Sequence, residues 1–186
     1  MAYQLYLPEK WASDMPRREA AGVPEDITFA PKWTITIALI ELAQKDGLTP
    51  APILADAGYG DVTEFRQRLT DKGIAYTVGL SHTTTVWPQG QQPLPPEPWS
   101  GRGKPAQNLR RSETHKPVTA KELALSLPKG RWETVTWREG SAGPMVSRFA
   151  RARVRPAHRD TQRTEPWPEQ WLLIEWPEDE AEPTKY

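Results

Sequence analysis

The sequence of 186 residues predicts a mixed α/β fold, in which helices and short strands alternate first and a β-rich unit with one short helix follows. The short apolar run 51–55 stops at Asp56 and is typical of a buried strand covered on both faces. Helical spacing before and after this run gives the alternation of helices and strands that builds parallel sheets. From residue 131 the pattern changes to charged residues that alternate with β-branched residues and tryptophan, which favours strands.

The start of the chain predicts a strand, a loop and a helix. Residues 3–7 alternate weakly and contain two tyrosines, as a strand would. Residues 8–24 are rich in proline and charge and predict a loop with one short helical turn. Residues 32–46 carry apolar side chains at helical spacing, and Gly47 follows where a helix-terminating residue is expected.

A capping signal predicts the next helix. Asp61 with Glu64 three positions later has the form of a capping box that opens a helix to about Asp71. Gly73 closes this helix, and the apolar segment 74–80 predicts another strand. The order strand, helix, strand, helix, strand indicates parallel neighbours joined by right-handed crossovers.

The second half of the chain begins after a boundary. Six prolines and three glycines fall within 87–105, a density that excludes a packed element. Thr119 with Glu122 predicts a second capping box and a short helix to about Leu127. The remaining predicted elements are strands at 131–138, 146–155 and 171–176 and a turn at 140–144.

The net charge of zero hides a basic region. Residues 102–163 carry 15 Lys and Arg against 5 Asp and Glu, whereas residues 1–101 have a net charge of −4 and residues 164–186 a net charge of −6. A local excess of positive charge favours a polyanionic partner, because phosphate binding depends on the local field. A solvated face balanced by the acidic end of the chain is the alternative.

Composition also excludes several classes of site. There are no cysteines, so disulfides and thiolate metal sites are excluded, and the three histidines lie far apart without metal-ligand spacing. No apolar run approaches the ~18 residues of a membrane helix. The first residues lack the regions of a signal peptide, so we expect a cytoplasmic protein without a membrane partner.

Asp56 is the candidate catalytic residue and metal ligand. Because it follows a strand, its carboxylate is expected at the carboxyl edge of the sheet, where open α/β sheets hold ligands and metals. An acid between a strand and a glycine is also a common turn former. The position alone leaves both interpretations open.

An arginine run is the candidate nucleic-acid contact. Strand alternation places Arg151, Arg153 and Arg155 on one face, with small apolar residues on the other. Their spacing of about 6.5–7 Å matches the scale of successive phosphates. Further candidate DNA-binding residues are Arg110, Arg111, Arg148 and Arg159. The alternative is a charge ladder paired with Glu133, Glu139 or the acidic end of the chain.

Three of the nine tryptophans lie in or beside this basic region. They are Trp87, Trp132 and Trp137. They are candidates for stacking on an unpaired base, and core packing is the alternative role.

Four segments of the sequence resemble bacterial insertion-sequence transposases of the DDE superfamily. They are Leu54–Gly60 (Leu-Ala-Asp-Ala-Gly-Tyr-Gly), Val78–Trp87, Arg131–Gly140 and Trp171–Pro177. The resemblance implies a partial ribonuclease-H-like sheet followed by a β-rich insertion unit. It divides the chain into a partial catalytic core (1–86), a Pro/Gly-rich and basic linker (87–117), and the insertion with an acidic tail (118–186).

The resemblance also implies the chemistry and the partner. Asp56 corresponds to the second of three catalytic acids, Mg²⁺ is the cofactor of the intact relatives, and DNA at transposon ends is the substrate. Two such ions about 4 Å apart activate the attacking oxygen and stabilise the leaving oxygen of a phosphodiester. The first acid would precede Tyr3 and the third would follow Tyr186. We therefore expect an internal fragment that binds no Mg²⁺ productively and has no cleaving or joining activity alone.

Two other interpretations stay open. The chain is alternatively a non-catalytic nucleic-acid-binding or interaction module, which interferes with a full-length transposase by occupying transposon ends. A third interpretation is an unproductive translation product that does not fold stably, with an exposed strand edge at 3–7.

Overall fold

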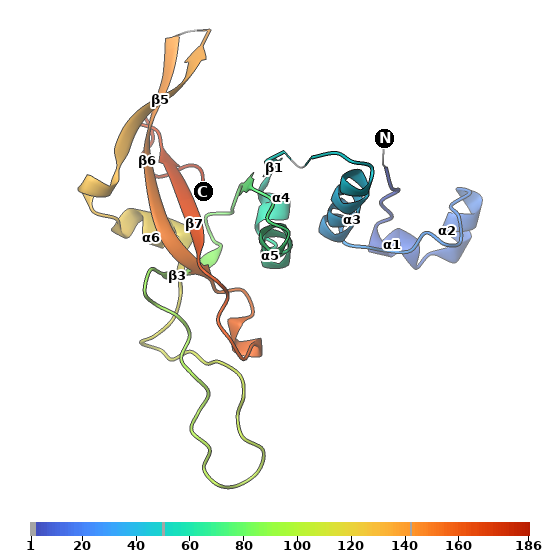
Figure 1. Ribbon diagram of the computed structural model, residues 1–186, viewed down its shortest axis with the longest axis horizontal. Helices are drawn as coiled ribbons and strands as arrows, with labels where there is room; N and C mark the ends of the chain where they lie inside the picture. The colour runs from blue at the N-terminus through green and yellow to red at the C-terminus, as the bar shows by residue number, and fades with distance from the viewer. Residues whose placement is uncertain (1–2, 50, 142) are drawn as a thin grey trace. The chain divides into compact units, whose positions relative to one another are not determined.

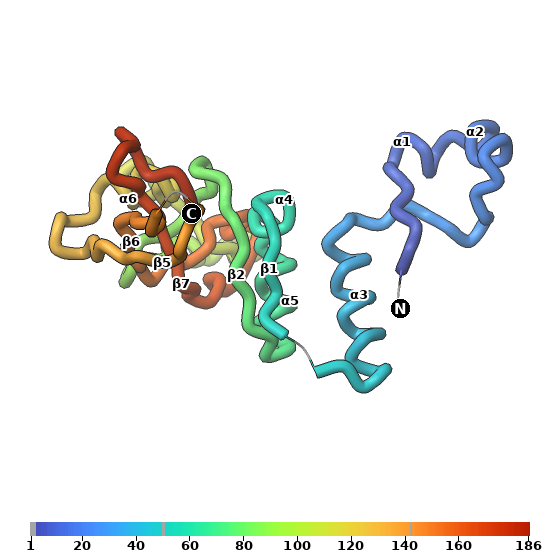
Figure 2. Tube along the Cα trace, turned by 90° about the horizontal axis from the view of Figure 1, so that it is seen from above, coloured from blue at the N-terminus to red at the C-terminus, as the bar shows by residue number. Residues whose placement is uncertain are grey.

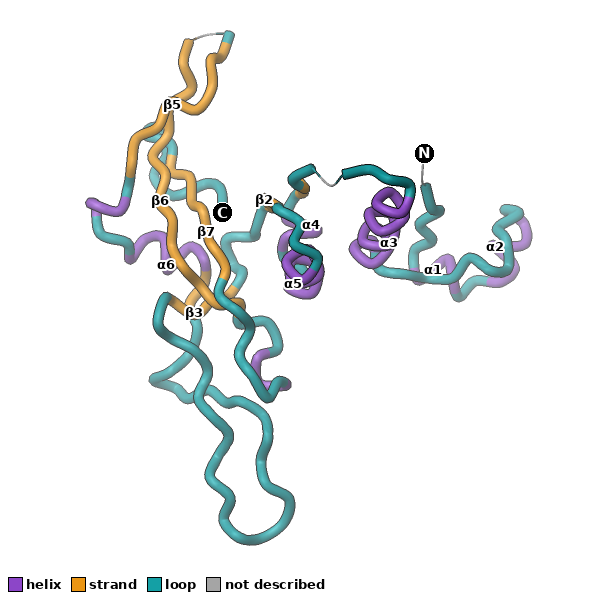
Figure 3. The backbone as a smooth tube through the Cα atoms, in the orientation of Figure 1, coloured by secondary structure: helices purple, strands orange, loops and turns teal. Residues whose placement is uncertain are grey.

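A computed structural model describes residues 3–49, 51–141 and 143–186 (Figure 1). The chain divides into two compact units, Met1–Gly79 and Leu80–Tyr186. Helices and two short strands make up the first unit, and the second is mostly β-sheet and loop (Figure 3). The mixed α/β class is therefore confirmed. The division into core, linker and insertion assigns roles rather than contacts and stays a prediction.

The first unit opens with short helices instead of a strand. Residues 3–7 form neither strand nor helix, and Tyr3 is 89% exposed, so the strand predicted there is wrong. Strand geometry needs a partner for its backbone hydrogen bonds, and the described residues supply none for this segment. Two helices follow where one helical turn was predicted, α1 (Glu9–Ala12) and α2 (Met15–Ala20).

The helix predicted at 32–46 is confirmed as α3 (Lys32–Lys45). It ends in a Schellman motif, in which Gly47 has φ 84° and the Leu48 N–H donates to the Ala43 carbonyl at 3.1 Å. Ile37 of this helix is buried in the core of the first unit. In the described part of the chain no helix, α3 included, is long and apolar enough to cross a membrane.

The two strands of the first unit are β1 (Ile53–Ala55) and β2 (Tyr76–Val78) (Figure 2). They pair in parallel, as predicted. Helix α5 (Thr63–Asp71) connects them and buries Phe65 and Leu69 in the same core as Ile37. Leu54 is 78% exposed, however, so the prediction that this strand is covered on both faces is wrong. Within the described residues the sheet of the first unit has only these two strands.

The capping box predicted at Asp61 is also wrong, because a short helix intervenes. This helix, α4 (Ala57–Gly60), follows β1 directly, and Asp61 is its C-terminal cap residue. Helix α5 then starts after Val62, which makes no side-chain capping bond. The helical periodicity of α5 is confirmed, but its N-terminal cap residue is Val62 instead of Asp61, so the helix starts one residue later than the capping signal predicts.

The second unit is built on a five-stranded antiparallel sheet. Its strands are β3 (Thr85–Pro88), β4 (Val118–Thr119), β5 (Glu133–Gly140), β6 (Gly143–Pro156) and β7 (Gln170–Trp176). The order is β4-β3-β6-β5, and β7 also pairs with β6. The length of β6 explains this arrangement, because different parts of it pair with β5, β7 and β3. The predicted turn at 140–144 includes residue 142, which lies outside the described residues.

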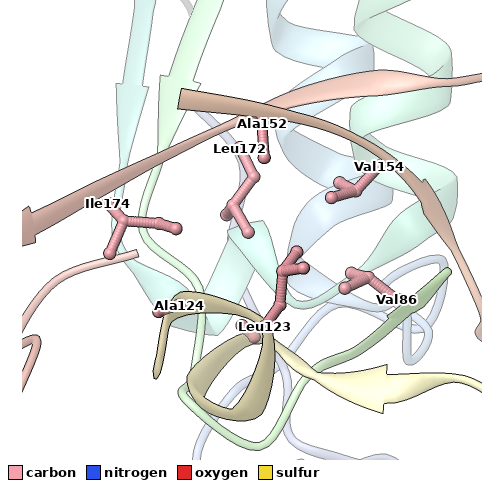
Figure 4. Close-up of a cluster of buried hydrophobic side chains, with 8 residues drawn as sticks. Val86, Leu123, Ala124, Ala152, Val154, Leu172 and Ile174 are labelled. Atoms are coloured by element: carbon pink, nitrogen blue, oxygen red, sulfur yellow. The ribbon is translucent and has the colours of Figure 1, made fainter. Parts of the chain in front are cut away.

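Helix α6 (Ala120–Ser126) covers one face of this sheet. The capping box predicted here is confirmed, with Thr119 and Glu122 bonded reciprocally. Leu123 and Ala124 of the helix meet the inward side chains of the strands, as Figure 4 shows. The strand residues of this core are Val86, Ala152, Val154, Leu172 and Ile174.

The Pro/Gly-rich segment 89–117 forms a long loop between β3 and β4, which we call the Pro/Gly-rich excursion. The Leu94 N–H donates to the Arg110 carbonyl at 2.9 Å, and the reverse bond measures 3.0 Å, which closes this excursion. Between residues 89 and 117 the structure has no helix or strand, as predicted. Trp87, however, lies in β3 with a fully buried side chain, so the prediction that 87–105 holds no packed element is wrong for its first two residues.

Two 3-10 helices and the end of the chain complete the unit. They are η1 (Lys129–Arg131), before β5, and η2 (Asp160–Gln162), between β6 and β7. The last residues return to the sheet. The Glu175 N–H donates to the Lys185 carbonyl at 2.9 Å, and Tyr186 packs against the core around α6.

Candidate metal ligand and nucleic-acid interface

Asp56 lies directly after the carboxyl end of β1. Its Oδ1 accepts a hydrogen bond from the Gly58 N–H at 3.0 Å, so the carboxylate caps the short helix α4. The residue is exposed to solvent. The structure therefore gives Asp56 both properties anticipated from the sequence: a turn-forming contact and an accessible carboxylate at a strand end.

Two glycines hold this turn close to β2. A Cβ added to Gly60 would overlap the carbonyl oxygen of Gly79, and one added to Gly79 would come within 3.1 Å of the Ala57 nitrogen. The Gly79 N–H donates to the Ala55 carbonyl at 2.9 Å, which extends the strand pairing to the residue before Asp56. Close backbone contact without side chains thus sets the position of Asp56.

Arg66 joins the turn to helix α5. Its guanidinium is buried and donates to the carbonyl of Gly60 and, at 3.2 Å, to the Thr63 hydroxyl. Burial lowers the pKa of Arg66, and nearby Tyr76, Asp61 and Glu64 counteract this effect. No pattern in the sequence predicts this role, because an arginine within a helix usually faces solvent.

The described residues meet only some of the requirements of a site for divalent metal ions. A carboxylate such as that of Asp56 is a hard oxygen ligand of the kind that Mg²⁺ binds. A centre with two ions needs several such ligands. Within 3–49, 51–141 and 143–186, no group of three or more His, Asp or Glu side chains is positioned to hold a metal ion. The described residues therefore do not form a two-ion centre by themselves.

The arginines of β6 line one face of the second unit. Ala152 and Val154 are buried in the core with α6, and Ala150 is buried at the same alternation, which leaves Arg151, Arg153 and Arg155 on the opposite face. This is the arrangement that strand alternation predicted. We call these three residues the arginine face.

An acidic residue partly neutralises the arginine face. Glu169 lies 3.5 Å from the Nε of Arg153 and 3.8 Å from a terminal nitrogen of Arg155. Arg155 also donates to the carbonyl of Trp167. The charge-ladder alternative therefore holds for part of this face, with the acid supplied from the acidic end of the chain. Arg151 stays exposed.

The other four candidate arginines lie elsewhere in the second unit. Arg110 pairs with Glu97 at 3.0 Å, and Arg111 pairs with buried Asp160 at 2.7 Å. Arg148 lies three residues before Arg151 in β6, so it does not belong to the alternating set of the arginine face. Its guanidinium lies 4.7 Å from the ring centre of Trp176. Arg159 is exposed and adopts a left-handed conformation with φ 49° before η2. Their DNA-binding roles stay predictions.

The tryptophans of the second unit have different environments from one another. Trp87 is fully buried, so the prediction that it stacks on a base is wrong. Trp132 packs edge-on against Trp176, with 5.3 Å between ring centres. Trp137 is exposed on β5, and Trp171 of β7 is 62% exposed beside the arginine face. Sequence reasoning missed Trp171, because four apolar residues in a row hide which of them face solvent.

A hollow of about 380 Å³ opens beside the arginine face. Its walls come from β5, β6, β7 and the segments that follow β3 and precede β5. They are formed by Gln89, Gly130, Arg131, Glu133, Arg151, Arg153 and Trp171. Two members of the arginine face thus share a concave surface with an exposed indole.

Comparison with known proteins identifies one family. Residues 1–144 match the family described as DDE superfamily endonuclease. A search of curated proteins and of solved structures finds no match. Asp56 lies within the matched range, whereas Arg151, Arg153 and Arg155 lie beyond it.

Proposed function

The chain belongs to the DDE superfamily endonucleases, and from this premise we propose that it is part of an insertion-sequence transposase that acts on DNA. In this proposal Asp56 is a catalytic carboxylate and metal ligand, and the arginine face contacts the phosphate backbone. The observation that carries the proposal is the accessible Asp56 carboxylate at the end of β1, set by the contact between Gly60 and Gly79.

The architecture supports this assignment. The parallel strands β1 and β2, joined through helix α5, form a strand-helix-strand unit, and a unit of this kind is compatible with a ribonuclease-H-like sheet. We propose that the first unit is part of such a sheet and that the antiparallel second unit is the insertion. The arginine face would then belong to the insertion and contact DNA outside the cleavage site.

Among the described residues, this proposal assigns the chemistry to the carboxylate of Asp56. Mg²⁺ ions in such a site would supply Lewis-acid stabilisation of the reacting phosphodiester. Asp56 is held by the Gly58 N–H and presents its carboxylate to solvent. One carboxylate does not organise two ions, so we propose that further acidic ligands come from outside the described residues. The chain alone would then neither cut nor join DNA.

The test combines a metal-binding and a cleavage measurement. Mn²⁺, used as a paramagnetic probe, should broaden the amide signals of residues around Asp56 in NMR spectra. The Asp56→Asn variant should lose this effect, and Asp46→Asn, an exposed acid in the same unit, should keep it. Supercoiled DNA should stay intact with Mg²⁺ and the wild-type chain. Nicking that disappears in Asp56→Asn would show an active enzyme, and broadening centred elsewhere would remove Asp56 as the ligand.

A second candidate function is a nucleic-acid-binding module without catalysis. The observation in its favour is that the arginine face and the adjacent hollow belong to Leu80–Tyr186, the unit that does not contain Asp56. Such a module would occupy transposon ends and compete there with a full-length transposase.

Salt dependence tests the DNA contact of both candidates. Binding of duplex DNA should weaken with salt, and replacing Arg151, Arg153 and Arg155 with Gln should reduce the slope of log K against log [salt] by about 2–3. The matched control replaces three exposed cations of the first unit, Lys10, Lys45 and Arg68, with Gln. Equal losses in the two triple variants would rule out the arginine face as the specific contact.

A further inference from the structure

The hollow beside the arginine face has the size of a ligand site. Its volume of about 380 Å³ lies near the lower end of the range of about 300–1,000 Å³ for small-molecule sites. The space is much larger than a phosphate group requires. Segments far apart in the sequence form its walls, so it exists only in the folded second unit.

Trp171 gives the hollow a stacking surface. It lies directly opposite Arg153 in the pairing of β6 with β7. The guanidinium carbons of Arg153 and Arg151 lie 5.0 Å and 5.7 Å from the centre of its ring. An exposed indole next to cations is the combination with which proteins bind single-stranded nucleic acid, because every base has a face that stacks.

Glu133 and Gln89 distinguish this hollow from a plain phosphate site. The Glu133 carboxylate only accepts hydrogen bonds and repels a bare phosphate. The Gln89 amide both donates and accepts. These groups suit the hydrogen-bonding edge of a base. In a regular duplex the Watson–Crick edges are paired and the faces are stacked, so neither is free to enter such a hollow.

We propose that this hollow binds one unpaired nucleotide of DNA. The base stacks on Trp171, its edge bonds to Glu133 and Gln89, and its phosphate lies against Arg151 and Arg131. The proposal rests on the proposed contact of the arginine face with DNA. Guanine fits best, because its N1–H and N2–H donors stand side by side and match the two oxygens of a carboxylate.

The experiment compares two labelled duplexes by fluorescence anisotropy. One is blunt and fully paired, and the other is identical except for a single unpaired guanosine. The full chain should bind the second about 5- to 50-fold more tightly, the range expected when one base stacks on an aromatic side chain. Trp171→Ala should abolish this preference and change the affinity for the paired duplex less than threefold.

Two further variants make the result specific. Trp137→Ala removes another exposed indole of the same unit and should leave the preference intact. Glu133→Gln should reduce the preference for an unpaired guanosine over an unpaired thymidine. Trp171 is largely exposed, so its variant should fold, which far-ultraviolet circular dichroism checks.

The possible outcomes separate a failure of the nucleotide site from a failure of the DNA contact. Equal binding of both duplexes by the wild type would overturn the nucleotide site and leave the DNA-binding arginine face in place. A preference that survives in Trp171→Ala would likewise overturn the site. Binding of neither duplex at low salt would overturn the DNA contact itself, and the nucleotide site with it.

Discussion

The indole Nε1 of Trp87 donates a 2.7 Å hydrogen bond to the Oδ2 of Asp160, and both side chains are fully buried. The Oδ1 of Asp160 accepts from Arg111, whose terminal nitrogen also donates to the Ala157 carbonyl at 2.6 Å. Strand β3, the returning arm of the Pro/Gly-rich excursion and the turn after β6 therefore meet at one carboxylate. Long loops otherwise have few contacts that define their paths.

Removing the donor of this bond should destabilise the chain. Trp87→Phe keeps an aromatic ring but leaves the buried Oδ2 of Asp160 without its indole partner, so we expect a loss of about 1–3 kcal/mol in the free energy of unfolding. Urea denaturation measures it. Trp99→Phe removes an indole that is 60% exposed and should change stability by less than about 0.5 kcal/mol. Equal effects of the two substitutions would contradict the role of the buried network.

The contact between Gly60 and Gly79 leaves no room for a methyl group. Gly60→Ala should therefore force α4 away from β2 and reduce the free energy of unfolding by about 1–3 kcal/mol. In NMR spectra the amide signals of Asp56 and Gly58 should shift with it. Gly130→Ala is the control, because its new Cβ would meet nothing within 4 Å. An unshifted Asp56 signal in Gly60→Ala would show that this contact does not position the carboxylate.

Glu175 should make stability depend on pH in acid. Burial tends to raise the pKa of its carboxyl, but hydrogen bonds from Lys185 and Ser147 outweigh this effect and hold the pKa below its usual value. A lowered pKa in the folded state contributes stability above the unfolded value of about 4.3, and this contribution is lost as pH falls through the folded pKa.

The expected difference appears when denaturation is repeated from pH 7 to pH 3. Glu175→Gln should be less stable than the wild type at pH 7, and the two curves should converge as the pH falls below about 4. Glu178→Gln, at an exposed position two residues after Trp176, should follow the wild type throughout. Parallel curves for wild type and Glu175→Gln would contradict the lowered pKa.

The capping box of α6 predicts a further loss of stability. In Thr119→Ala the Glu122 N–H loses the hydroxyl that it contacts at 3.1 Å, and we expect a cost of about 0.5–2 kcal/mol. Thr114→Ala, in the exposed part of the excursion, should have a much smaller effect on the midpoint of denaturation. Because α6 covers the core of the second unit, an unchanged midpoint in Thr119→Ala would mean that the helix contributes little to that core.

Local patterns in the sequence predicted much of the structure. The capping residues of α6, the Gly47 terminator of α3 and the alternation of the arginine face all appear as expected, because each depends on residues within one or two turns or along one strand. The start of α5 at Thr63 shows the limit of this reasoning. Asp61 is the C-terminal cap residue of α4, a short helix after β1 that the sequence did not predict, and Val62 takes the N-terminal cap position of α5.

The sequence by itself determined the family resemblance, the carboxylate after β1 and the one-sided arrangement of Arg151, Arg153 and Arg155. Only the tertiary structure decided which indoles are buried and which are free: Trp87 bonds to Asp160 and lies inside, whereas Trp171 stands exposed beside Arg153. The physical reason is the range of the interactions. Strand and helix periodicity act between near neighbours, but burial depends on pairing β6 with β3 and β7, which no local pattern specifies.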